Sequence, residues 1–152
     1  MQIEIDQSGK IGKTNEDTVL AFSNGTQSAI LIPRHVKQAC LRTLRRQGYE
    51  PNTIYIRLFV AGLYHLLCQH MATIDLAIID IEYPGHNETI RRYLLNLLRR
   101  DGPEIRKERI TFAYVGKDSP AHAVALATFR RQRLAERVVY SGDGERRLAR
   151  PP

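Results

Sequence analysis

The sequence has few of the residues that mark secreted, disulfide-linked or zinc-binding proteins. It contains only two cysteines, Cys40 and Cys68, which lie far apart in apolar stretches without the paired spacing of a zinc site. We therefore expect two buried thiols in a reducing compartment. Tryptophan is absent, and aromatic residues make up 7% of a chain that is 43% hydrophobic and 26% charged. This composition is typical of a globular domain and excludes a disordered or fibrous chain.

Targeting and membrane signals are also missing. Residues 1–6 have neither the positive start nor the apolar run of a signal peptide. The longest apolar stretch, residues 54–71, carries Arg57 and two histidines, and an arginine near the middle of a span is costly in a bilayer. We expect a cytoplasmic protein with no membrane partner. The apolar stretch would form a helix buried in the core or in the seam of a homodimer.

Positive charge is in excess, and arginine supplies most of it. The chain has 23 Lys and Arg against 16 Asp and Glu, a formal net charge of +7, and 18 of the 23 are arginine. Because guanidinium groups match phosphate oxygens two at a time, clustered arginines favour a nucleic-acid partner. Solvated outer faces of helices are the alternative explanation. The candidate phosphate-binding residues are Lys10, Arg91, Arg92, Arg130 and Arg131.

The hydrophobic pattern predicts the element order β-β-β-α-α-β-α-β-α. An Asn-Gly pair at residues 24–25 predicts a hairpin turn between the second and third strands. A Ser-Pro pair at residues 119–120 predicts the N-cap and first residue of the last helix. The expected strands cover residues 2–6, 18–22, 28–32, 74–80 and 109–115, and the expected helices lie between Pro33 and Gly48, at 53–71, from about 90 to 102, and from 119 to about 137.

This order predicts the sense of each strand. Short hairpin loops make consecutive strands antiparallel, whereas helical crossovers make strands parallel. We therefore expect an α/β domain over residues 1–140, with a mixed five-stranded sheet of three antiparallel strands followed by parallel strands, flanked by helices. Residues 141–152 are basic and contain several Gly and Pro, and we expect them to form a disordered tail.

Acidic residues stand where two of the predicted strands end. Asp6 closes the first strand and Asp80 closes the fourth, so parallel neighbouring strands would bring these carboxylates about 5 Å apart. Glu82 has the same side-chain parity as Asp80 and is a further candidate. Paired carboxylates at the carboxyl ends of strands need a cation or a shared proton to offset their repulsion. The alternative is that Asp6 and Asp80 are turn and capping residues.

A histidine begins the last predicted helix. His122 falls in its first turn, and a helix start faces the sheet ends in such folds. The side chain could bind a metal or transfer protons, although a lone histidine has more often a structural role. Asp118 precedes the N-cap, where a carboxylate favours the helix dipole whether or not it takes part in chemistry.

Three short segments resemble the RNase H-like superfamily, and most closely its RuvC-type Holliday-junction resolvases. Residues 5–9, Ile-Asp-Gln-Ser-Gly, match the first-strand aspartate motif. Residues 80–87 place an acidic residue seven positions before an asparagine, as the fourth strand of the resolvases does. Residues 121–127, Ala-His-Ala-Val-Ala-Leu-Ala, fit the alanine-rich last helix. The resemblance extends over about residues 1–137.

The resemblance implies a metal-dependent endonuclease or resolvase. Asp6 and Asp80, with Asp118, Glu82 or His122, would hold Mg²⁺ or Mn²⁺, and the partner would be branched or otherwise structured DNA in repair or recombination. The chain departs from the family in two respects: Asp80 replaces the usual Glu, and Ser119 stands where a second acidic residue is usual. Two alternatives remain open, a catalytically inactive nucleic-acid-binding module of the same fold and an assembly subunit that uses residues 54–71 as its seam.

Overall fold

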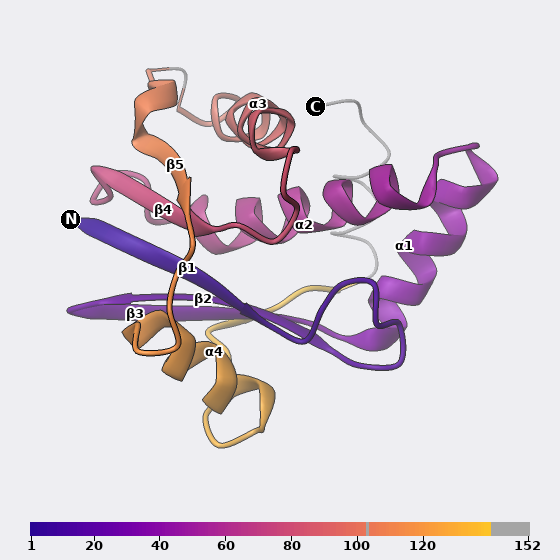
Figure 1. Cartoon of the computed structure of the whole chain (residues 1–152), viewed down its shortest axis with the longest axis horizontal. Coiled ribbons are helices and arrows are strands. Elements are labelled where there is room, and N and C mark those ends of the chain that lie inside the picture. The colour runs from indigo at the N-terminus through magenta and orange to yellow at the C-terminus, as the bar shows by residue number, and fades with distance from the viewer. Residues whose placement is uncertain (103, 141–152) are drawn as a thin grey trace.

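A mixed sheet with the strand order β5-β4-β1-β2-β3-β6 forms the centre of the protein (Figure 1). The computed structural model describes residues 1–102 and 104–140, and the predicted tail at 141–152 lies outside the described residues. The strands of this part of the chain are β1 (Gln2–Ser8), β2 (Thr18–Asn24), β3 (Thr26–Ile32), β4 (Leu76–Asp80), β5 (Ile110–Ala113) and β6 (Arg137–Val138). The helices are α1 (Arg34–Arg46), α2 (Pro51–Leu67), α3 (Asn87–Leu98), α4 (Pro120–Phe129) and a short 3₁₀ helix, η1 (Lys107–Arg109).

The strand senses agree with the sequence prediction. β1 pairs with β2 and β2 with β3 in antiparallel fashion, while β1, β4 and β5 are parallel. The hairpin between β2 and β3 turns at Gly25, whose φ of 76° is a conformation that glycine adopts without strain. The three antiparallel strands followed by parallel strands are therefore confirmed.

Helices cover both faces of the sheet. Figure 1 shows α1, α2 and α3 on one side and α4 alone on the other. The larger core lies under the three helices, and a small cluster that includes Val19, Ala29 and Ala125 packs between the sheet and α4. The two sides of the sheet therefore differ greatly in thickness.

The interior position of α2 explains its apolar sequence. Residues 58–67 are all buried within this single chain, where α2 contacts α1, α3 and the strands β2 and β3. The choice between a core helix and a dimer seam therefore resolves in favour of the core. Within residues 1–102 and 104–140, no helix has both the length and the apolar character needed to cross a membrane.

The expected five-stranded sheet is wrong by one strand, because the chain leaves the last helix earlier than its composition predicts. α4 ends at Phe129 instead of continuing to about residue 137, and Arg131 takes a left-handed conformation with φ 60°. The chain then returns along β3, where β6 pairs in parallel and Glu136 accepts a hydrogen bond from the Ala29 amide at 2.7 Å. Satisfying the backbone groups of the β3 edge outweighs the helical propensity of residues 132–137.

Candidate metal centre

The register of two neighbouring strands places Asp6 beside Asp80. In the parallel pair β1–β4, Ile5 lies opposite Ile79, and the next residue of each strand is the aspartate. Ile5 and Ile79 point into the core under α2, so the aspartates that follow them point to the other face of the sheet. The predicted juxtaposition of the two carboxylates is confirmed.

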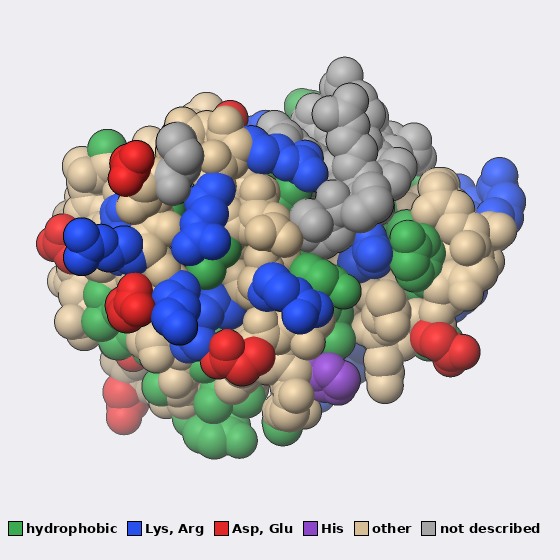
Figure 2. All heavy atoms as spheres, turned by 90° about the horizontal axis from the view of Figure 1, so that it is seen from above, with side chains coloured by type: hydrophobic (Ala, Val, Ile, Leu, Met, Phe, Trp, Pro, Cys, Tyr) green, Lys and Arg blue, Asp and Glu red, His purple; other side chains and the backbone are tan. Residues whose placement is uncertain are grey.

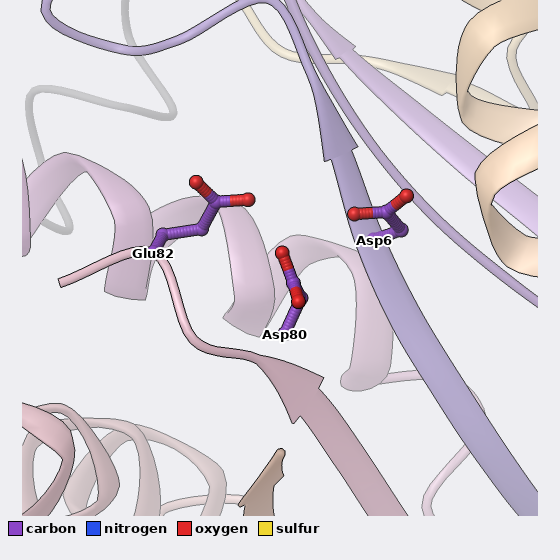
Figure 3. Close-up of side chains that lie close together, drawn as sticks. All are labelled: Asp6, Asp80 and Glu82. Carbon is purple, nitrogen blue, oxygen red and sulfur yellow. The ribbon is translucent and has the colours of Figure 1, made fainter. Parts of the chain in front are cut away.

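Glu82 completes a cluster of three carboxylates. It follows β4 by two residues, and the chain there is fixed by a backbone hydrogen bond from Ile81 to Ala113 of β5. One carboxylate oxygen from each of Asp6, Asp80 and Glu82 lies within 4.8 Å of the others. Figure 3 shows the three side chains pointing toward a common space.

The spacing of the cluster suits a hard divalent cation. An octahedral ion with ligands at about 2.1 Å places adjacent ligands about 3 Å apart and opposite ligands about 4.2 Å apart. Oxygens within 4.8 Å of one another reach these values after side-chain movements of less than about 1 Å. An all-oxygen donor set is typical of Mg²⁺, Ca²⁺ or Mn²⁺ and disfavours Zn²⁺.

Backbone amides orient two of the carboxylates. The Gln7 amide donates to Asp6 Oδ1 at 2.8 Å, and the Val115 amide donates to Asp80 Oδ1 at 2.7 Å. Val115 belongs to the loop that follows β5, so the third parallel strand contributes to the site through its backbone. Each aspartate is therefore held in one orientation before any ion binds.

His122 reaches the same cluster from α4. Ser119 caps α4 by accepting a hydrogen bond from the Ala121 amide, which confirms the predicted start of this helix. The first turn then carries His122, whose Nδ1 lies 2.7 Å from Asp6 Oδ2. Because the carboxylate accepts, Nδ1 carries the proton, and Nε2 is the ring nitrogen that remains for a proton transfer.

The electrostatics of the cluster favour a protonated carboxyl group at neutral pH. Burial raises the pKa of Asp6 above its usual value, although the hydrogen bond and charge of His122 act against this rise. Burial raises the pKa of Glu82 as well, and a hydrogen bond with Asp80 and the charges of Asp80 and Asp6 add to it, bringing the value to about 8. Glu82 is therefore mostly protonated at pH 7, and a cation that used it as a ligand would displace that proton.

Asp118 is not part of the cluster. It lies on an exposed turn before α4, where the Ser119 amide bonds to the Gly116 carbonyl at 3.0 Å. The acidic cluster found among the described residues contains Asp6, Asp80 and Glu82. Of the candidates for completing the site, the fold brings Glu82 and His122 to the two aspartates and leaves Asp118 outside.

The predicted phosphate-binding residues do not all lie near the carboxylates. Lys10 does, since it shares a cavity with Glu82 and its charge opposes the rise in the Glu82 pKa. The guanidinium of Arg91 already has partners within the protein. Its Nε donates to the Ile110 carbonyl at 2.9 Å, and its Nη1 pairs with Glu88. Ile110 begins β5, three residues or about 10 Å along the strand from the level of Asp80.

The remaining arginines lie on outer surfaces. Arg92 is exposed on α3, with its guanidinium 5.4 Å from the Tyr93 ring. Figure 2 shows Lys and Arg side chains, interspersed with acidic ones, on the face seen from above in Figure 1. Arg130 and Arg131 are exposed at the far end of α4, with Arg130 about 12 Å along the helix axis from His122.

Two residues beside the cluster were missed by the sequence reasoning. Tyr55, in the second turn of α2, lines the same cavity as Lys10 and Glu82. Lys37 of α1 is fully buried, and its Nζ donates to the Lys10 and Lys13 carbonyls at 3.2 and 2.7 Å and to Thr18 Oγ1 at 3.0 Å. Lys37 could have been identified from the sequence, because it occupies one of the otherwise apolar positions of α1.

Comparison with protein-family models, with curated proteins and with solved structures found no match to this chain.

Proposed function

We propose that the protein is a divalent-metal-dependent endonuclease or resolvase of RNase H-like architecture that acts on structured nucleic acid. The observation that carries the proposal is the convergence of Asp6, Asp80 and Glu82 from the ends of two parallel strands. Mg²⁺ or Mn²⁺ would be the cofactor, because the donors are carboxylate oxygens. The net charge of +7 favours a polyanionic substrate.

The sheet supports the RNase H-like part of this proposal. Its three antiparallel strands, followed by parallel strands on the other side of β1, have the arrangement that the sequence resemblance implies. The first-strand aspartate, the fourth-strand aspartate and the last-helix histidine come from the three segments on which that resemblance rests. Their meeting in space is an independent support for it.

Each residue of the cluster has a separate role in the proposed reaction. A bound divalent ion would supply an activated water for in-line attack on a phosphodiester and would stabilise the leaving oxygen. Asp6 and Asp80 would supply carboxylate oxygens to the ion. Glu82 would release its proton on binding the ion. His122 keeps Asp6 oriented through Nδ1 and offers Nε2 for proton transfer.

Metal-dependent cleavage of a substrate panel tests the proposal. We expect the full chain to cut at least one of a four-way junction, a branched duplex, an RNA–DNA hybrid and a single strand when Mg²⁺ or Mn²⁺ is present, and none in EDTA. We also expect either ion to raise the thermal unfolding temperature, because it binds the folded cluster and not the unfolded chain. Absence of both cleavage and metal stabilisation would overturn the proposal.

A nucleic-acid-binding module without catalysis is the second candidate. The exposure of Asp118 favours it, because among residues 1–102 and 104–140 the segment at the start of α4 then adds no carboxylate to the three of the cluster. Such a module would bind nucleic acid with a steep salt dependence and show no cleavage with either ion. The same substrate panel therefore separates the two candidates.

A further inference from the structure

A cavity of about 210 Å³ opens beside Glu82, and three separate segments build its walls. Lys10, Gly12 and Lys13 come from the loop between β1 and β2, Tyr55 comes from α2, and Glu82 comes from the segment after β4. Since Glu82 belongs to both the cavity and the carboxylate cluster, the two spaces adjoin. A molecule held in the cavity would extend to the cluster.

The inner walls suit a planar, partly polar ring. Tyr55 supplies an aromatic side chain, and Gly12 lies next to it: a Cβ on Gly12 would be in van der Waals contact with the Tyr55 ring at 3.7 Å, so a longer side chain there would take up cavity space. Gln7 also lines the cavity, and its Oε1 is buried with no hydrogen-bond partner in the described part of the chain. A turn of this side chain toward the cavity would let the amide pair with the edge of a base.

The rim of the cavity suits phosphate. Lys10 and Lys13 are both exposed there. Their backbone is fixed from the protein interior, because the buried ammonium of Lys37 donates to both of their carbonyls. The lysines therefore stand on an anchored loop, which lowers the entropy lost when they bind an anion.

We propose that this cavity receives one unpaired base of a DNA strand whose adjacent phosphate lies over the carboxylate cluster. Its volume is below the range of about 300–1,000 Å³ for whole drug-sized ligands, which suits a single ring system. A base within a continuous duplex is stacked and paired on both sides and cannot enter. The inference rests on the proposed function for the chemistry at the neighbouring phosphate, and it narrows the substrate to strands with an unpaired nucleotide beside the cut.

The test compares two probes with equal numbers of phosphates. Fluorescence anisotropy would measure binding of a labelled oligothymidylate and of an abasic strand of the same length, in EDTA and again in Ca²⁺. Stacking on an aromatic side chain contributes about 1–3 kcal/mol per base, so Tyr55→Ala should weaken oligothymidylate binding by about 5- to 150-fold. The same substitution should leave abasic-strand binding nearly unchanged, because the phosphate contacts remain.

Several variants separate a cavity effect from a general loss of structure. Tyr55→Phe keeps the ring and should retain discrimination between the two probes. Gly12→Leu should fill the cavity and remove that discrimination, whereas Tyr140→Ala, which changes a tyrosine 69% exposed elsewhere on the surface, should not. Equal weakening of both probes by Tyr55→Ala would indicate a structural role and overturn the proposal. Competition by free thymidine monophosphate as effective as that by the strand would overturn the assignment to a strand.

The experiments distinguish failure of the base cavity from failure of the proposed nuclease function. Base-dependent binding that needs Tyr55, without metal-dependent cleavage, would retain the base cavity and reject the nuclease. Metal-dependent cleavage that Tyr55→Ala leaves unchanged, on substrates with and without an unpaired nucleotide, would retain the nuclease and reject the cavity. Failure to bind oligothymidylate in either EDTA or Ca²⁺ would also reject the cavity.

Discussion

Nδ1 of His122 lies 2.7 Å from Oδ2 of Asp6, although the two residues are 116 positions apart in the sequence. The contact joins the first strand to the last helix across the thin side of the sheet. Asp6 is nearly inaccessible, with 6% of its side chain exposed, whereas 29% of the His122 side chain is exposed. The histidine is therefore the solvent-facing partner of a buried carboxylate.

This geometry predicts that His122 acts by positioning Asp6. His122→Ala removes the donor, and the pKa of Asp6 should rise further because the hydrogen bond and charge of His122 both lower it. Outer partners of metal ligands are typically worth 10- to 100-fold in metal affinity or activity. We expect His122→Ala to raise the Mg²⁺ concentration required for half-maximal cleavage by about that factor.

Two further substitutions distinguish the possible roles of the histidine. His122→Asn keeps an N–H donor toward Asp6 and cannot transfer protons at neutral pH, so recovery by Asn supports positioning. An Asn variant as defective as Ala, with unchanged Mg²⁺ dependence, would instead assign proton transfer to His122. If cleavage recovers in His122→Asp and not in His122→Asn, His122 is a metal ligand.

Substitution of either aspartate should remove cleavage without weakening nucleic-acid binding. Asp80→Asn keeps the oxygen that accepts from the Val115 amide and removes the charge, so the fold should be retained. We expect Asp80→Asn and Asp6→Asn to abolish metal-dependent cleavage and to leave DNA binding in EDTA unchanged or tighter, because a like charge near phosphate is lost. Weaker DNA binding with retained cleavage in either variant would contradict this assignment.

The raised pKa of Glu82 predicts a pH-dependent metal affinity. With a pKa of about 8 in the metal-free protein, Glu82 must lose a proton before it can bind a cation. Mg²⁺ affinity should therefore rise about tenfold per pH unit below pH 8 and level off above it. Isothermal titration calorimetry in buffers of different ionisation enthalpy would measure both the affinity and the proton released.

Glu82→Gln provides the control for this titration. Gln cannot release a proton, so the variant should bind Mg²⁺ more weakly and with a much smaller pH dependence. The metal-free wild type gives a second readout. Because the folded pKa lies above the unfolded value, the stability contributed by protonated Glu82 is fully present below pH 4.5 and is lost as the pH rises through 8. A pH dependence of Mg²⁺ affinity that is the same in wild type and Glu82→Gln would reject Glu82 as the titrating ligand.

The meeting of Asp6 and Asp80 was predictable because it depends on local patterns. Asp80 ends β4 and Asp6 lies two residues before the end of β1, and the lengths of the connections fix whether neighbouring strands are parallel. The parity that buries Ile5 and Ile79 also determines the face on which the aspartates emerge. The convergence of these side chains then required one further condition, that the first and fourth strands lie side by side, as β1 and β4 do.

Other features of the site depend on tertiary contacts and could not be predicted. β6 replaces the end of a predicted helix because the edge of β3 offers unpaired backbone groups, and Glu136 bonds to the Ala29 amide there. The cavity at Tyr55 exists only where three distant segments meet. Lys37 occupies a buried position that its charge disfavours, and the two loop carbonyls and the Thr18 hydroxyl that accept from its Nζ offset this cost.

The anchored loop predicts an unusual pH dependence of stability. Burial lowers the pKa of Lys37 to about 8, against 10.5 in the unfolded chain, so the unfolded state binds more protons between these values. The free energy of unfolding should therefore rise with pH in this window, by about 2 kcal/mol at pH 9.5 relative to pH 7. Urea unfolding of wild type and Lys37→Met would isolate this contribution, because the variant lacks it and the difference between the two should widen above pH 8.

Lys37→Met should also connect the loop to binding. It leaves the Lys10 and Lys13 carbonyls and the Thr18 hydroxyl without their buried donor, so the loop that carries both rim lysines should loosen. We expect oligothymidylate affinity to fall in Lys37→Met at pH 7. Lys117→Met, which removes an exposed lysine and the same unit of charge, controls for the change in net charge. If the two variants bind alike and show the same dependence of stability on pH, Lys37 neither anchors the loop nor titrates in this window.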